Sequence, residues 1–136
     1  MIGEKIYEVI ANWRVVEYGD TPDGTRYDFH FEGKAIGKIN GAVQGIDYAT
    51  VDRDNNVSQH VHETITTDED VTISVLRRGK AIPLPSGDGQ YKVLGFAKYN
   101  TGSPKYSWLN STLAAIEGTG KPTNPNLNLM AFVLKT

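Results

Sequence analysis

A period-two alternation of apolar and polar residues runs through most of the chain, and it limits the fold more than any other feature. Residues 5–16 show it first, because one parity of this segment holds Tyr7, Val9, Ala11, Trp13 and Val15. Successive side chains of a β-strand point to opposite faces, so this spacing predicts a strand with one apolar face. No segment repeats apolar residues at helical spacing over several turns. The sequence therefore predicts an all-β protein.

The same alternation predicts seven further strands, which are joined mainly by short turns. They cover residues 27–31, 46–51, 57–66, 71–78, 91–99, 112–118 and 127–134. Segments rich in Asp, Asn and Gly between them are typical of turns, with residues 52–56 and 68–70 read as hairpins. Glycines also recur every four residues from Gly33 to Gly45, and this predicts short strands with bulges, bends or close backbone approach.

Eight or nine strands in 136 residues favour a single antiparallel β-barrel of about eight strands. A closed barrel removes the exposed strand edges that an open sheet would leave. A two-sheet sandwich is the alternative. The sequence contains no domain boundary or internal repeat, so we expect residues 1–136 to form one barrel domain. A barrel of this size is either filled by its own side chains or holds one small ligand.

Composition argues against several classes of partner and chemistry. The formal net charge is −2 with both signs interspersed, so neither nucleic acid nor an anionic membrane is an expected partner. There is no apolar run long enough for a membrane span and no signal-peptide pattern, so we expect a cytoplasmic protein. The chain has no cysteine, which excludes disulfides and thiolate nucleophiles. No phosphate-binding glycine loop is present, and no cofactor is predicted.

His60 and His62 are the sharpest candidates for chemistry. They are two residues apart on a predicted strand, so both imidazoles point to the same side and can meet one ligand or metal. Histidine suits acid–base work because its pKa lies near physiological pH. A pair of solvent-facing histidines is the simpler alternative. A cupin-type metal site is a third, although Thr66 and Thr67 stand where that pattern has its glutamate.

Asp47 and Arg77 are the next candidates. Asp47 lies in an otherwise apolar strand, where desolvation would raise its pKa into the range of a general base. The alternative is that Asp47 caps a turn by accepting backbone hydrogen bonds. Alternation puts Arg77 and Arg78 on opposite faces, so at most one enters the interior. An arginine there would orient a carboxylate or enolate, whereas the alternative is a pair of charges at the rim.

The run TGSPKYSWLN, residues 101–110, breaks the strand pattern with glycine and proline and predicts a corner. Tyr106, Trp108 and Asn110 share a parity if this run is extended. Together with Tyr99 of the preceding strand, Tyr106 and Trp108 are predicted to form the apolar walls of a pocket. Asn110 is predicted to bond a ligand carbonyl, or else to cap the corner; for Trp108, core packing is the alternative.

Three blocks of the sequence resemble the family known as domain-of-unknown-function family 3237. TPDGTR at residues 21–26 follows a long first strand. GIDYATVDRDNNV at residues 45–57 and TITTDEDVTISVLRRG at residues 64–79 are similar to a Gly-x-Asp-aromatic element and a Thr-Asp-Asp/Glu hairpin of that family. TGSPKYSWLN is similar to its strongest signature. The matches occur in the right order over nearly the whole chain.

This resemblance implies a barrel similar to those of allene-oxide cyclase and the calycins, and it implies no settled activity. The chain departs from the family in one strand. Where the family has an aspartate followed two residues later by a basic residue, this sequence has His60 and His62. If that aspartate is catalytic in the family, this member has changed its acid–base group or lost the chemistry.

The leading hypothesis is a barrel that binds a small, partly apolar organic molecule and acts as a cofactor-independent isomerase, cyclase or lyase. His60, His62 and Asp47 are its predicted acid–base groups, and Asn110 and Arg77 its predicted orienting groups. One alternative is a non-catalytic binding or assembly barrel whose outer face forms a homo-oligomer. The other is a cupin-like metal enzyme that uses the two histidines. The sequence leaves open whether the protein is an enzyme.

Overall fold

The computed structural model describes residues 2–86, 88–121 and 126–134, most of which lie in β-strands. The strands are β1 (Ile2–Thr21), β2 (Gly24–Gly37), β3 (Gly41–Val51), β4 (Val57–Thr67), β5 (Thr72–Pro83), β6 (Tyr91–Asn100), β7 (Leu113–Lys121) and β8 (Asn126–Leu134). A short 3₁₀ helix, η1 (Ser107–Ser111), lies between β6 and β7. Within the described residues, no helix is long and apolar enough to cross a membrane.

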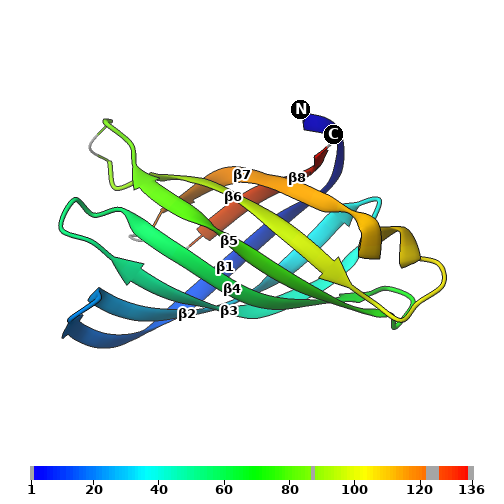
Figure 1. Cartoon of the computed structure of the whole chain (residues 1–136), viewed down its shortest axis with the longest axis horizontal. Helices are drawn as coiled ribbons and strands as arrows, with labels where there is room; N and C mark the ends of the chain where they lie inside the picture. The colour runs from blue at the N-terminus through cyan, green and yellow to red at the C-terminus, as the bar shows by residue number, and fades with distance from the viewer. Residues whose placement is uncertain (1, 87, 122–125, 135–136) are drawn as a thin grey trace.

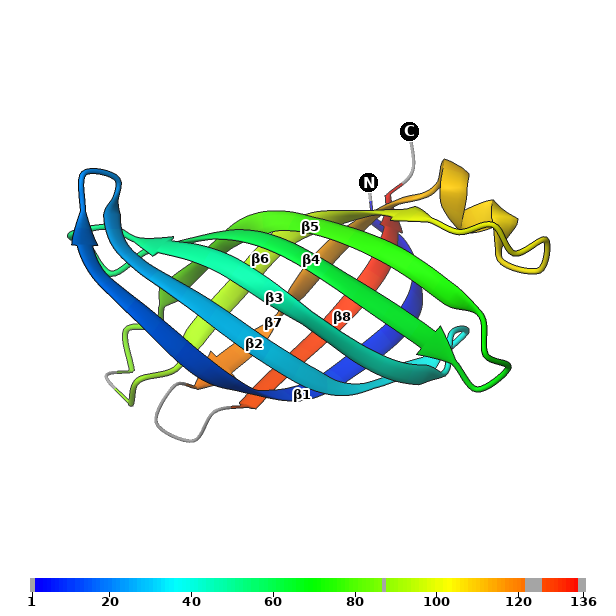
Figure 2. The same cartoon turned by 90° about the horizontal axis from the view of Figure 1, so that it is seen from below.

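Each strand pairs antiparallel with its neighbour in sequence, and β8 closes onto β1 to complete a barrel (Figure 1). The closure is visible from the second direction in Figure 2. At the seam, Val9 of β1 opposes Ala35 of β2 on one side and Leu129 of β8 on the other. Each of the eight described strands therefore has a partner on both sides. The expected all-β, antiparallel barrel of about eight strands is confirmed.

Alternation decides which side chains enter the barrel. In β4, Val61, Glu63 and Ile65 are buried, whereas the intervening His62 is exposed. The other strands follow the same rule, since a pleated strand offers one face to the interior and the other to solvent. The inner faces meet along the axis of the barrel and form one core of valine, isoleucine, alanine and tyrosine side chains.

The two ends of the barrel differ in how they are filled. The end that carries the β2–β3 and β4–β5 turns is closed by aliphatic side chains, and Ile39, Ile65, Ile73 and Leu109 are at most 1% exposed there. Leu109 comes from η1, which lies against this end (Figure 1). The opposite end carries larger side chains that are only partly buried. The interior is therefore packed at one end and has room at the other.

Two glycines show why the strands can wrap so tightly. A Cβ atom added to Gly33 would lie 2.0 Å from the carbonyl oxygen of Ile10, and one added to Gly45 would lie 2.4 Å from that of His62. The close backbone approach predicted from the glycine spacing is confirmed. The prediction of short strands is wrong, because β2 and β3 run for 14 and 11 residues. The missing side chains let adjacent strands approach without interrupting their pairing.

Candidate functional site

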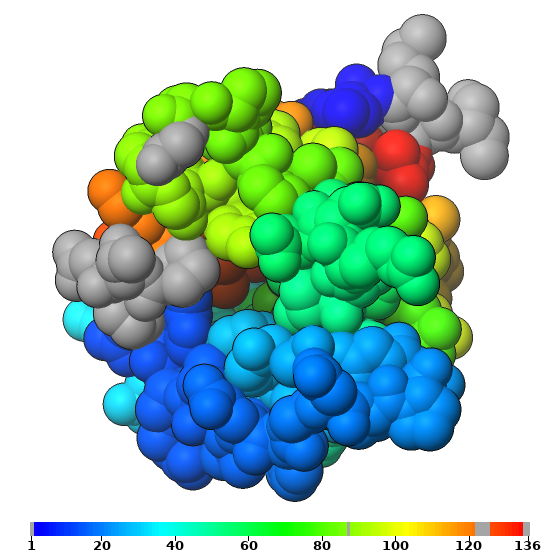
Figure 3. All heavy atoms as spheres, turned by 90° about the vertical axis from the view of Figure 1, so that its left-hand side faces the viewer, coloured from blue at the N-terminus to red at the C-terminus, as the bar shows by residue number. Residues whose placement is uncertain are grey.

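A cavity of about 500 Å³ opens at the end of the barrel that carries the β1–β2 and β3–β4 hairpins. Figure 3 looks onto this end, where the surface is hollowed between the two hairpins. Trp13, Tyr27, Phe29 and Tyr91 line the cavity. The rings of Trp13 and Phe29 meet edge to face, with their centroids 6.0 Å apart. A largely apolar cavity of this volume has the size of sites that hold small organic ligands.

Asp47 of β3 lies in the wall of this cavity and is only 6% exposed. Its Oδ1 accepts a hydrogen bond of 3.1 Å from the backbone N–H of His60, and the side chain of Gln59 donates a second bond. Burial raises the pKa of Asp47 to about 6, although the positive charge of Arg77 and both hydrogen bonds act in the opposite direction. A carboxyl group with this pKa can both accept and return a proton near neutral pH.

Arg77 of β5 lies in the same wall and forms a buried ion pair. Its Nε donates to Oε1 of Glu63 at 2.5 Å, and the two side chains are 5% and 4% exposed. Burial acts to lower the pKa of Arg77, but the charge of Glu63 and the hydrogen bond to it outweigh that effect and raise it. Arg77 is therefore a permanent cation at the base of the cavity, and Glu63 neutralises it.

The guanidinium keeps donors for another partner. Arginine has five N–H donors, and the bond to Glu63 uses the one on Nε. The guanidinium carbon also lies 5.6 Å from the centroid of the Phe31 ring. Among the described residues, no buried side-chain nitrogen or oxygen lacks a hydrogen-bond partner. Within the part of the chain that the structure describes, the hydrogen bond of the Arg77 side chain is the one from Nε to Glu63, and Arg77 lines the cavity, so its Nη donors are available to a molecule bound there.

Tyr99, predicted as a pocket wall, is buried in the interior and is not among the described residues that line the cavity. Its hydroxyl is 2.8 Å from that of Tyr7, and both side chains are buried. The two rings meet edge to face. Burial raises the pKa of both phenols well above the usual tyrosine value. Both phenols therefore stay protonated near neutral pH and add no charge to the interior.

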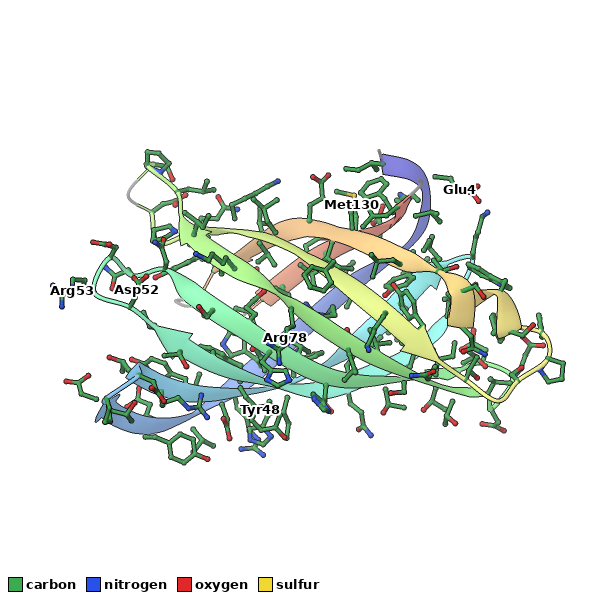
Figure 4. All side chains as sticks on the ribbon, in the orientation of Figure 1. Glu4, Tyr48, Asp52, Arg53, Arg78 and Met130 are labelled. Atoms are coloured by element: carbon green, nitrogen blue, oxygen red, sulfur yellow. The ribbon has the colours of Figure 1, made fainter. Side chains whose placement is uncertain are left out.

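His60 and His62 lie on the outer wall and do not share the cavity with Asp47. Their ring centroids are 5.2 Å apart, and the ring of Tyr48 packs against both. Partial burial, followed by the charges of Arg78 and His62, lowers the pKa of His60. Tyr48 and Arg78, labelled in Figure 4, are exposed on the same wall. The alternation of β4 leaves the two histidines outside because the opposite parity carries the buried Val61 and Glu63.

The three candidates from TGSPKYSWLN lie at the closed end, away from the cavity. The segment forms η1 and is not extended, so Tyr106, Trp108 and Asn110 do not share one face. Tyr106 is buried, and its hydroxyl donates to Glu69, whereas Trp108 is 41% exposed. Asn110 bonds both the backbone N–H and the carbonyl of Thr101 and so fastens the corner. This capping role was the predicted alternative for Asn110.

Glu63 and Trp13 were not predicted as residues of the site. Both signals were present in the alternation, because Glu63 shares its parity with Val61 and Ile65, and Trp13 with Val9 and Ala11. A charged residue on an otherwise apolar face needs a partner when it is buried. That partner, Arg77, comes from the next strand, and only the pairing register of β4 with β5 brings the two together.

No group of three or more His, Asp or Glu side chains within the described ranges could hold a metal ion. The paired histidines of β4 therefore lack the further ligands that the cupin-like alternative requires. Asp47 and Glu63 are buried, and the charge of Arg77 acts on both of them.

No protein-family model matches the sequence, and no curated protein sequence matches it significantly. Solved structures share its fold. A β-barrel-like protein from Acinetobacter baumannii AYE has a TM-score of 0.83 at 22% identity, over 99% of this chain and 96% of that one. A protein of unknown function from Clostridium acetobutylicum scores 0.84 at 22% identity, over 97% and 98%. An enzyme from Penicillium herquei scores 0.62 at 19% identity, over 97% and 96%. At these identities the likeness establishes the fold alone.

Proposed function

We propose that the cavity binds a small, partly apolar carbonyl compound and that the protein acts on it as a cofactor-independent isomerase, cyclase or lyase. Asp47 is the general base, and Arg77 stabilises negative charge on the carbonyl oxygen. One observation carries the proposal: a buried carboxyl group with a raised pKa and a buried arginine line the same aromatic-lined cavity. Groups tuned in this way are typical of sites that move protons.

The proposed step needs no external reagent. The Asp47 carboxylate removes a proton from the carbon next to the carbonyl group of the ligand, and the C–H electron pair becomes the double bond of an enolate. The carbonyl π pair moves onto oxygen, where the Nη groups of Arg77 donate hydrogen bonds to the new negative charge. Asp47 then returns its proton to the same or another carbon, so atoms and electrons balance.

A non-catalytic binding barrel is the second candidate, and the bond between Arg77 and Glu63 favours it. Glu63 neutralises the guanidinium at 2.5 Å, which weakens its pull on a developing oxyanion. Such a protein would bind the same ligands without moving their protons. Turnover separates the two candidates, because only the enzyme exchanges the α-protons of a bound ketone with solvent deuterium.

Membership of domain-of-unknown-function family 3237 belongs to this proposal and rests on the three sequence blocks. The fungal barrel described as an enzyme is consistent with catalysis on this fold, although a shared fold is a weak argument for a shared function. A cytoplasmic location and a homo-oligomer stay predictions from the sequence.

Binding is tested through Trp13, which lines the cavity. The chain has two tryptophans, so the variant W108F leaves Trp13 as the single reporter. We expect the neutral ketone benzylacetone to quench Trp13 fluorescence in a saturable way. Ala81→Phe, which narrows the cavity, should abolish saturation, whereas Ser58→Phe on the outer wall should preserve it. Equal binding by both phenylalanine variants would contradict a site in the cavity.

A further inference from the structure

We infer that the ligand enters the cavity uncharged and that Asp47 enforces this choice. The cavity accepts a planar, enolisable carbonyl compound and rejects a carboxylate of the same shape while Asp47 is ionised. This inference rests on the proposed function and names its class of substrate. Asp47 would then have two roles, as the general base and as the residue that determines which ligands bind.

Several charged side chains line the cavity or lie beside it. Glu63 and Arg77 neutralise each other through a 2.5 Å bond, so Asp47 carries the net charge in the wall of the cavity. The positive charge of Arg26 also acts on Asp47. His60 contacts Asp47 through its backbone N–H, and its imidazole lies on the outer wall of the barrel. The remaining titratable groups that line the cavity are Arg14, Glu17, Tyr27 and Tyr91. The buried hydroxyls of Tyr7 and Tyr99 bond each other in the interior.

The Nη donors of Arg77 are what a ligand oxygen would contact. Asp47 and Arg77 both lie opposite Val61 in the pairing of their strands, one on each side of β4, so their side chains enter the cavity at the same level. An oxygen on the Nη atoms therefore comes close to the Asp47 carboxyl group. A second negative charge there is disfavoured, because like charges repel strongly where water is largely excluded. A ketone or amide oxygen meets no such repulsion.

In addition to the neutral Glu63–Arg77 ion pair, the site accommodates one negative charge. Either Asp47 or the ligand carries that charge. In the resting site Asp47 holds it. After proton transfer the enolate holds it, and Asp47 is neutral. A carboxylate imitates that second state, so it binds together with a proton that Asp47 takes up. Its affinity should fall about tenfold for each pH unit above the Asp47 pKa.

The test compares two probes that differ in charge and little in shape, trans-cinnamate and trans-cinnamamide. Trp13 fluorescence in the W108F protein reports both. Between about pH 6 and about pH 8 we expect cinnamate affinity to fall roughly 50-fold, while cinnamamide affinity stays constant. In the D47N protein the cinnamate affinity should no longer depend on pH. Glu17→Gln, which removes a carboxylate at the rim, should retain the wild-type pH dependence.

Two results would overturn the inference and leave the proposed function intact. One is equal affinity for cinnamate and cinnamamide at about pH 8, and the other is the same pH dependence in D47N as in the wild type. Failure of both probes to bind the wild-type protein would instead overturn the proposed function, and the inference with it. A circular-dichroism spectrum of D47N checks that the barrel is intact in each comparison.

Discussion

Asp47 and Arg77 face one cavity from strands β3 and β5, and both lie opposite Val61 of the intervening strand. The Arg77 charge favours the ionised form of Asp47, while burial disfavours it more strongly, so the Asp47 pKa rises to about 6. A base of moderate strength and a permanent cation therefore line the same cavity.

Breaking the ion pair between Glu63 and Arg77 should destabilise the interior. Arg77→Met leaves the buried Glu63 charge without a partner, and we expect a loss of about 3–5 kcal/mol in the free energy of unfolding. The double variant E63M/R77M replaces both charges by apolar groups and should recover most of that loss. Urea unfolding measures both. A double variant as unstable as R77M would contradict this reading of the pair.

The hydrogen bond between Tyr7 and Tyr99 gives a second test of the interior. Tyr99→Phe removes one hydroxyl and leaves the other buried without its partner, which should cost about 1–3 kcal/mol. Y7F/Y99F removes both hydroxyls and should lie closer to the wild type than the two single variants together. A double-mutant cycle by urea unfolding measures this coupling. Strict additivity of the single variants would mean that the two hydroxyls do not interact.

Asp47 should make the protein less stable as the pH rises. Its pKa is raised in the folded state from an ordinary value of 3.8 to about 6. The folded state therefore binds the proton more tightly, and the stability from that proton is complete below about pH 4 and lost as the pH rises through 6. The unfolding free energy of wild type minus that of D47N should fall by roughly 3 kcal/mol between about pH 4 and about pH 7. A constant difference would show that Asp47 titrates normally.

The two outer histidines should not affect the cavity. His60 and His62 lie on the opposite face of β4 from Val61 and Glu63. The double variant H60A/H62A should bind benzylacetone with wild-type affinity and unfold within about 1 kcal/mol of the wild type, as outward-facing substitutions usually do. Fluorescence titration and urea unfolding check the two statements. Loss of binding in this variant, with the fold intact, would show that the histidines belong to the binding site.

The sequence was enough to predict the barrel, because alternation is a local property that each strand shows by itself. The sequence indicated only an apolar neighbourhood for Asp47, and the structure places it on the same face of β3 as the buried Val43 and Ala49. It did not reveal which face of β4 was inside, since one face carries Glu63 and the other the two histidines. Burial of Glu63 depends on Arg77, which approaches only through the pairing of β4 with β5. A contact of this kind has no local signature.

The corner at residues 101–110 shows a different limit. Its glycine and proline predicted a break correctly, but the side chains after the break depend on the conformation adopted there. In η1 the backbone turns every three residues, so an argument from strand parity does not apply to Trp108 and Asn110. The sequence therefore predicted the corner correctly. The prediction that its side chains form a pocket wall was wrong because it assumed an extended backbone.

The most direct test of the account is the rate at which the protein exchanges the α-protons of benzylacetone with solvent deuterium, followed by NMR. We predict exchange by the wild-type protein and by H60A/H62A at similar rates, and a rate at least about 100-fold lower for D47N, as expected when a general base is removed. Equal rates for D47N and the wild type would contradict a catalytic role for Asp47. Binding without exchange in the wild-type protein would identify the barrel as a carrier.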